Sequence, residues 1–308
     1  MQGLAEFRIF YNHTIHPELV RMEMKRKQLL WLFLLSIFLL IAVIGLDIYL
    51  GAFAFALVLM IPLGLWTSFL LYRIQRFRST FKPQVVDLIL DFVDDDANFG
   101  TLSYDSKKFI DKKRFMQSGL FGTRILEYNG EDFISGKIGE LDFELCELSV
   151  KALSRVKTDL DEVFRGVFLH ATFNTQTEGA VIVWPRETKQ YRSKAIKNFI
   201  SSGGKNVDHY MEVESFRELF TTYATSEAHV DKTLNREMQI ALADYRIQTD
   251  KAVYFSFMAD NVYIGVTEPK DILEPSIFKN NTDFELVQEF FEDLRMLFSI
   301  VEAIDQNN

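Results

Sequence analysis

The sequence predicts an α+β protein, in which an N-terminal transmembrane helical hairpin precedes a mainly antiparallel sheet domain with a long C-terminal amphipathic helix. Three observations predict it. Two apolar runs lie back to back near the N-terminus, short alternating segments follow them as hairpins, and helical periodicity returns at the end of the chain. Strands that arrive as hairpins, with helices at the ends, are typical of antiparallel α+β domains rather than of doubly wound sheets.

The hairpin is predicted from the runs Gln28–Tyr49 and Gly51–Tyr72. At about 1.5 Å per helical residue, each is long enough to cross a bilayer core of about 30 Å. Asp47 is the one charged residue within these runs, and the join leaves room only for a tight turn. The predicted boundaries are a cytoplasmic N-terminal lead at 1–27, the hairpin at 28–72, a juxtamembrane helical connector at 73–104 and a cytoplasmic α+β domain at 105–308.

Basic residues flank the hairpin on both sides and are absent from its turn. Because Lys and Arg are held on the cytoplasmic side, we expect a multi-pass protein of the cell inner membrane with both termini in the cytoplasm. The single Cys146 suits a reducing compartment. The same basic residues are predicted to lie at the membrane surface, where each cation contributes about 1 kcal/mol toward anionic headgroups. They are Arg21, Lys25, Arg26, Lys27, Arg73, Arg76 and Arg78.

Charge is divided unevenly along the chain. Residues 1–82 carry nine basic and four acidic groups, whereas the remainder carries 25 basic and 39 acidic groups, a net charge of −14. An acidic domain repels phosphate backbones, so the sequence argues against nucleic acid as a partner. The expected partners are the lipid bilayer itself and another membrane or membrane-associated protein.

Helices are predicted at five places besides the two apolar runs. Pro17 is suited to the first turn of a helix that runs on into the first span. Ser79 or Thr80 with Pro83 predicts a separate helix start, and Asp94–Asp96 its end. The remaining helices are expected at 107–118, at 231–247 and at 284–304, where apolar side chains recur every three to four residues.

After Gly119, apolar side chains recur at every second residue, which is the period of a strand. Asn129-Gly130, a strong tight-turn dipeptide, predicts a hairpin turn between two strands. About seven strands followed by a helix are also compatible with a pleckstrin-homology-like roll. The predicted strands are 124–128, 133–138, a strand from Leu141 to Leu148, 166–173, 180–184, 209–213, 253–257 and 262–266.

Motifs for chemistry are weak. The sequence contains no phosphate-cradling glycine motif and no nucleophile elbow. The acidic run from Asp94 to Asp105 resembles a calcium loop but has Phe99 where glycine is needed. We therefore predict no cofactor, no metal and no catalytic residue. The most distinctive stretch predicts a binding edge formed by Asn129, Gly130, Glu131 and Asp132, with His170 as a further candidate in an apolar strand.

The same stretch carries a family resemblance. The ordered glycine, aromatic and acidic positions run from Phe115, Ser118-Gly119 and Gly130-Glu131-Asp132 through Phe164-Arg165-Gly166 and Val183-x-Pro185 to Glu214-x-Phe216 and Tyr223-Ala224. Over about residues 105–304 this pattern resembles a bacterial membrane-protein family catalogued only as a domain of unknown function, with two transmembrane helices before a cytoplasmic α+β domain. The resemblance implies the architecture and the bacterial inner membrane, and it transfers no activity.

Three hypotheses about function remain. The first is a non-enzymatic binding or scaffold module on the cytoplasmic face, which engages a protein or lipid partner. The second is a membrane-anchored enzyme whose site is assembled only in the fold, in a deep pocket around His170 or residues 129–144. The third is a homo-oligomer formed through the spans, where Gly45, Gly51 and Gly64 permit close approach of helices.

Overall fold

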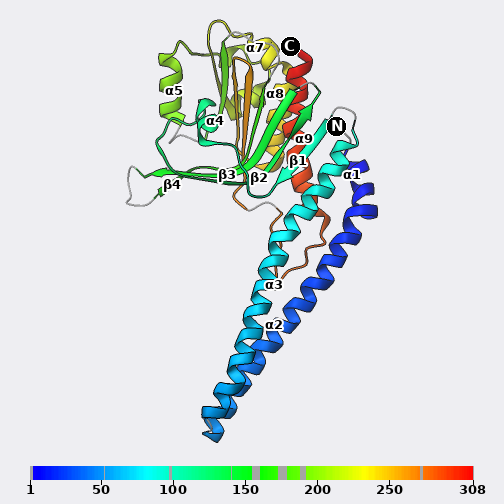
Figure 1. Cartoon of the computed structure of the whole chain (residues 1–308). Coiled ribbons are helices and arrows are strands. Elements are labelled where there is room, and N and C mark those ends of the chain that lie inside the picture. Colours follow the sequence, from blue (N-terminus) through cyan, green and yellow to red (C-terminus); the bar gives the residue numbers. More distant parts are fainter. Residues whose placement is uncertain are drawn as a thin grey trace. The chain divides into compact units, whose positions relative to one another are not determined.

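The computed structural model describes residues 3–51, 53–96, 99–139, 141–154, 160–172, 179–187, 192–270 and 273–307. It consists of two compact units (Figure 1). The helical unit comprises residues 2–92 and 272–291, and the sheet unit comprises residues 93–271 and 292–308. Long apolar helices, an antiparallel sheet and a C-terminal helix confirm the predicted α+β class.

The helical unit begins with α1 (Leu4–Phe10) and the π-helical turn η1 (Tyr11–Ile15). These run into α2 (His16–Leu50), which has Pro17 in its first turn as predicted. Gly51 ends α2 in the left-handed conformation with φ +64°, which confirms the tight turn. The second long helix, α3, spans Phe53–Asp94.

The predicted helix start near Pro83 is wrong, because α3 continues through both Pro62 and Pro83. The hydroxyls of Ser79 and Thr80 donate to the carbonyl of Arg76 within the preceding turn, so neither caps a new helix. Each proline removes one backbone hydrogen-bond donor from the helix. The helical turns on either side of each proline remain, so α3 is continuous. The end of the helix at Asp94 is confirmed.

Two helices are long and apolar enough to cross a membrane, one ending at Tyr49 and one beginning at Leu57. Their apolar side chains are largely exposed, as at Phe38 (66%), Ile48 (75%) and Leu65 (68%). A helix in the core of a soluble protein has the same composition but buries these side chains. The exposed apolar surface therefore suggests membrane association.

The polar end of the helical unit has a small core of its own. The ring of Phe7 stacks on Phe291 with centroids 3.8 Å apart and also packs on Phe92 at 5.2 Å. The segment 273–283 lies against η1, where the Tyr11 hydroxyl donates to the Thr282 carbonyl at 2.6 Å. Aromatic packing of this kind adds about 0.5–1.5 kcal/mol per pair beyond burial.

The sheet unit is built on one sheet in which every pairing is antiparallel, and its strand order is β1-β2-β3-β4-β9-β8-β5-β7-β6. Within the part of the chain that the structure describes, the sheet has nine strands in place of the predicted seven or so, and this order does not support a pleckstrin-homology-like roll. The strands are β1 (Phe99–Asp105), β2 (Ile125–Ile138), β3 (Leu141–Leu153), β4 (Leu160–Thr172), β5 (Ala180–Pro185), β6 (Lys205–Asn206), β7 (Phe220–Ala224), β8 (Val253–Met258) and β9 (Asn261–Thr267).

Helices cover both faces of this sheet. They are α4 (Lys112–Gln117), α5 (Arg192–Ser201), α6 (Glu214–Leu219), α7 (Val230–Thr233), α8 (Arg236–Thr249) and α9 (Phe284–Asn307), with the 3₁₀ turn η2 (Asp208–Tyr210). Side chains alternate between the faces of a strand. On β3, Cys146 belongs to the core cluster that contains α4 and α5 residues, whereas Phe143 packs on Phe298 of α9 with centroids 4.9 Å apart. Figure 1 shows α8 beside α9.

Two fully buried side chains mark the α4 face. The indole Nε1 of Trp184 donates to the Leu120 carbonyl at 2.9 Å. The thiol of Cys146 is buried and accepts a hydrogen bond from the Ile110 amide at 3.3 Å. Burial raises the pKa of this thiol to about 12, so it remains protonated and unreactive at neutral pH.

A charged cluster lies buried on the α9 face of the sheet unit. Lys251 Nζ lies 2.8 Å from Asp293 Oδ2 and 2.7 Å from Glu268 Oε2. The Tyr245 hydroxyl donates to Asp293 Oδ1 at 2.6 Å. Burial raises the pKa of the Asp293 carboxyl, and the neighbouring ammonium opposes this shift. The cluster links α8, the segment just before β8, the residue just after β9, and α9.

Three segments of the sheet unit differ from prediction. The strand predicted at 209–213 is wrong, because Asp208–Tyr210 forms η2 and residues 211–213 lead to α6. The strand β7 was not predicted, although it pairs with β5 and lies between β5 and β6 in the sheet. The strand β1 was also not predicted, because its polar alternation follows an acidic run.

Candidate functional site

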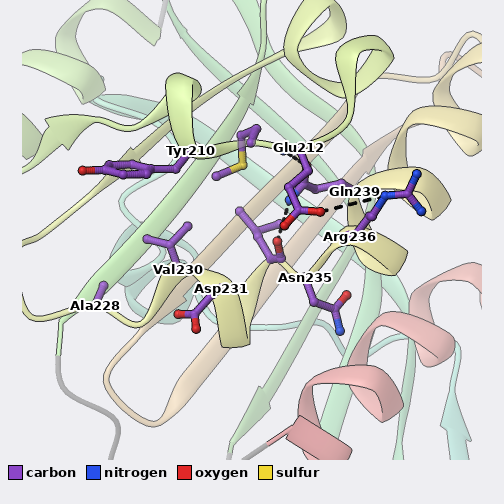
Figure 2. Close-up of a pocket in the computed structure, with 10 residues that line it drawn as sticks. Tyr210, Glu212, Ala228, Val230, Asp231, Asn235, Arg236 and Gln239 are labelled. Atoms are coloured by element: carbon purple, nitrogen blue, oxygen red, sulfur yellow. Dashed lines mark hydrogen bonds and ion pairs between the residues drawn. The ribbon is translucent and has the colours of Figure 1, made fainter.

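A groove beside the start of α8 is the leading candidate for a binding site (Figure 2). Its volume is about 460 Å³, within the range of roughly 300–1,000 Å³ typical of ligand sites. The ionisable groups of the described lining are the carboxylates of Glu212 and Asp231, the phenol of Tyr210 and the guanidinium of Arg236. The lining residues are Tyr210, Met211, Glu212, Ala228, Val230, Asp231, Leu234, Asn235, Arg236 and Gln239.

Two amide side chains build this groove. Asn235 caps α8, since its Oδ1 accepts from the Met238 amide at 2.9 Å. Gln239 is buried, and its Oε1 accepts from the amides of Glu212 and Val213 at 3.0 and 3.1 Å. Gln239 also donates to the Leu234 carbonyl at 2.8 Å. These bonds hold the 211–213 segment against α8 and fix the shape of the groove.

The groove has an apolar floor and a charged rim. Met211 and Leu234 are buried at its base, whereas the Tyr210 side chain is 67% exposed. Figure 2 shows Glu212 directed toward Arg236, with 3.9 Å between a carboxylate oxygen and Nε. Both side chains of this pair are exposed, so it contributes at most about 1 kcal/mol and opens readily for a ligand. The groove therefore offers apolar contact at its base and charged groups at its rim.

The predicted turn at Asn129-Gly130 is wrong, because both residues lie within the continuous strand β2. The irregularity comes later: the β2–β3 register shifts between Glu131 and Ile134, and Asp132 has φ +59°. Gly130 serves close packing instead, since a Cβ there would lie 2.7 Å from the side chains of Leu148 and Phe109. The reversal of the chain follows at Gly139, which has φ +58°.

Glu131 and Asp132 do come together with a third carboxylate, that of Glu147 on β3. One oxygen from each lies within 4.8 Å of the others. The Tyr104 hydroxyl donates to Asp132 Oδ1. Hard oxygen ligands of this kind are those that Ca²⁺ and Mg²⁺ prefer, although acidic groups often gather without a cation. The register pair Glu131–Glu147 is a consequence of strand alignment that no local sequence pattern reveals.

His170 lies on β4 between Glu144 of β3 and Tyr263 of β9. Its Nε2 is 2.7 Å from Asn261 Oδ1, and its Nδ1 is 3.9 Å from Glu144 Oε2. Glu144 is also paired with Arg114 of α4. Burial lowers the pKa of His170, so the ring is neutral at pH 7. The described linings of the groove beside α8 and of a second groove beside α5 include neither His170 nor residues 129–144.

The basic residues predicted at the membrane surface divide into two groups. Arg21, Lys25, Lys27, Arg73, Arg76 and Arg78 are exposed. Arg26 is buried, and its Nε donates to Glu23 Oε2 at 2.7 Å while Nη1 donates to the Ile277 carbonyl. Arg26 therefore binds the 273–283 segment and is not available to headgroups. Arg78 is paired with Glu274 at 3.3 Å.

Comparison with known proteins gives one family and one solved structure. None of the curated proteins matches the chain. A crystal structure of the mycobacterial trehalose monomycolate transport factor A, TtfA, aligns with a TM-score of 0.31 and 10% identity over 67% of this chain and 88% of that chain, a likeness too low to carry an inference. A family model also matches the chain from β4 onward. It does not include residues 105–161, which carry part of the glycine, aromatic and acidic pattern that resembles a known family. Residues 162–306 match the family described as a protein of unknown function (DUF3137), which confirms the resemblance to a domain of unknown function.

Proposed function

We propose that this chain is a non-enzymatic binding module anchored to the cytoplasmic face of a bacterial inner membrane. The observation that carries the proposal is the exposed apolar surface of α2 and α3 in helices that continue into a packed polar end. Such a surface is stable in hydrocarbon and is costly in water. The basic residues on both flanks and their absence from the turn favour cytoplasmic termini.

The groove beside α8 is the proposed point of engagement, and an amphipathic segment of a membrane-associated protein is the proposed partner. The apolar floor formed by Met211 and Leu234 would receive the apolar side of that segment, and the exposed Tyr210 would close over it. Tethering raises the effective concentration of a membrane-borne partner, so a modest affinity at a groove of this size is sufficient.

The enzyme hypothesis has less support. It needs convergent ionisable side chains in a deep pocket, and the rim of the groove offers an exposed ion pair instead. His170, the other candidate, is buried and bonded to Asn261.

The anchor is tested by alkaline carbonate extraction of membranes and by a reporter fused after Asn308. We expect the chain to remain in the pellet and the reporter to be active only in the cytoplasm. Release into the supernatant, or a reporter accessible from outside, contradicts the proposal.

The groove is tested in cells with a photoreactive residue in place of Tyr210. We expect a crosslinked species of defined mass that disappears when Val230→Arg fills the groove. A photoreactive residue in place of Leu126, which is 48% exposed outside the groove, is the matched control. Equal crosslinking at both positions, or crosslinking at Tyr210 that survives Val230→Arg, excludes the groove as the point of engagement.

A further inference from the structure

A second groove of about 440 Å³ lies between the loop after α4 and the helix α5. Two cations line it, Arg124 from the loop and Lys194 from the first turn of α5. The side chains of both cations are exposed to solvent. Among the described residues, no acidic side chain forms an ion pair with either of them. Two such cations of separate origin in one groove are an arrangement suited to an anion.

Glycine geometry brings these two segments together. A Cβ at Gly122 would lie 2.5 Å from the Ala195 nitrogen and 2.8 Å from the Lys194 carbonyl carbon. Only a glycine therefore permits the loop to contact the backbone of α5 so closely. The contact places Arg124, two residues after Gly122, in the same groove as Lys194.

The charge around the groove is opposite to that of the domain. Residues 107–124 carry six basic groups and one acidic group, and residues 192–205 carry four basic groups and no acidic one. Ten of the 25 basic groups after residue 82 therefore lie in two short segments of a region whose net charge is −14. Lys112 Nζ donates to the Ile125 carbonyl at 2.9 Å, which brings a further cation beside Arg124.

The rest of the lining combines hydroxyl and amide groups with an apolar surface. Thr123, Asn198 and Ser202 supply hydrogen-bonding groups, whereas Met116, Phe199 and Met258 supply apolar contact. Phe199 is the neighbour of Trp184, with ring centroids 6.4 Å apart. A ligand with a compact anionic group and an apolar part matches this lining.

We propose that this groove binds a phosphate monoester attached to an apolar group. A monoester carries about −1.5 to −2 charges at pH 7, which two cations neutralise. The phosphate oxygens would accept from Arg124 and Lys194, and the apolar group would lie on Phe199 and the methionines. The same chemistry is offered by a soluble phosphorylated metabolite and by the headgroup of a phosphatidic acid.

The probe is 4-nitrophenyl phosphate, whose ring absorbs and quenches tryptophan emission. The full chain is held in phosphatidylcholine nanodiscs, and Trp31→Phe with Trp66→Phe leaves Trp184 as the one tryptophan. We expect saturable quenching by the phosphate ester and at least tenfold weaker quenching by 4-nitrophenol. Arg124→Gln and Lys194→Gln are each expected to weaken binding about tenfold or more, the size expected for the loss of a charged hydrogen bond.

Two control substitutions distinguish a specific binding site from general electrostatic attraction to basic residues. Lys113→Gln removes a cation of the same region outside the lining, and Lys232→Gln removes one from α7. Each is expected to change affinity less than twofold. An unchanged Trp184 emission maximum in every variant reports an intact fold.

Competition then identifies the source of the phosphate. Displacement of the probe by vesicles containing phosphatidic acid, and not by phosphatidylcholine vesicles, supports a headgroup. Displacement by a soluble alkyl phosphate such as hexyl phosphate supports a soluble ligand. The proposal is overturned if 4-nitrophenol binds equally well, if Lys113→Gln or Lys232→Gln weakens binding as much as Arg124→Gln, or if neither competitor displaces the probe.

Discussion

Replacing Lys251 by methionine is expected to lower the free energy of unfolding of the sheet unit by about 3–5 kcal/mol. Its ammonium lies within 2.8 Å of both Asp293 and Glu268, and all three side chains are buried. Methionine fills most of the same volume, so the loss arises from two buried carboxylates that no longer have this cation between them. At about 2–4 °C per kcal/mol for a unit of this size, the midpoint of thermal unfolding falls by about 6–20 °C.

The assay is a urea titration of the full chain in detergent micelles, followed by Trp184 emission in the Trp31→Phe/Trp66→Phe background. Lys137→Met is the matched control, because Lys137 is half exposed and lies 3.9 Å from the exposed Asp142. This variant is expected to cost less than about 1 kcal/mol. A second variant, Lys251→Met with Asp293→Asn, removes one of the two carboxylates and is expected to recover part of the loss. Equal costs for Lys251→Met and Lys137→Met would refute the reasoning.

Three further substitutions test other parts of the fold. Gly166→Ala places a Cβ 2.0 Å from the Val266 carbonyl at φ +145°, and we expect a loss above about 3 kcal/mol in the same titration; a loss below 1 kcal/mol contradicts this. Because burial raises the pKa of Asp293 above its ordinary 3.8, the folded chain holds that proton more tightly, so its contribution to stability is present at low pH and is lost as the pH rises through the folded pKa. Asp293→Asn should remove this decline from the pH dependence of unfolding, and an unaltered profile would show that another group causes it. Arg26→Met leaves the Glu23 carboxylate buried, and we expect trypsin cleavage within the 273–283 segment to accelerate about tenfold or more, whereas the exposed Lys25→Met leaves the rate within twofold.

Long-period patterns in the sequence predicted the long helices well, whereas the short helices α5 and α6 were not predicted. The apolar runs and the stripe at 284–304 appear as α2, α3 and α9, because a periodic face many turns long determines its element without help from distant residues. The failure at Pro83 has a local cause. The dipeptide Ser79-Thr80 has the composition of a cap, but its hydroxyls bond backward to Arg76.

Short signals in the sheet were less reliable. Asn129-Gly130 has the composition of a tight turn, yet the pairing of β2 with β3 along both of its halves stabilises a continuous strand through it. The segment Phe220–Ala224 follows α6 without a break, and only its pairing with β5 makes it a strand. In both segments, pairing with a neighbouring strand determines the structure, and a local sequence pattern does not contain that information.

Neither groove was predicted from sequence. The groove beside α8 depends on Gln239, a residue whose buried bonds to Glu212 and Val213 join segments far apart in the chain. The groove beside α5 had a readable signal, which was the concentration of basic residues at 107–124 and 192–205 within an acidic region. The prediction at Arg26 failed for a related reason, since its partner carbonyl at Ile277 is about 250 positions away.

The inert, buried state of Cys146 has a practical consequence for spectroscopy. The thiolate is the form that attacks a reagent such as a maleimide, and a pKa of about 12 leaves almost none of that form at neutral pH. The native sequence therefore serves directly as a silent background for spin or dye labelling. Single cysteines introduced on the helical unit and on the sheet unit would then report the distance between the two units across a lipid membrane preparation, without any change to the native core.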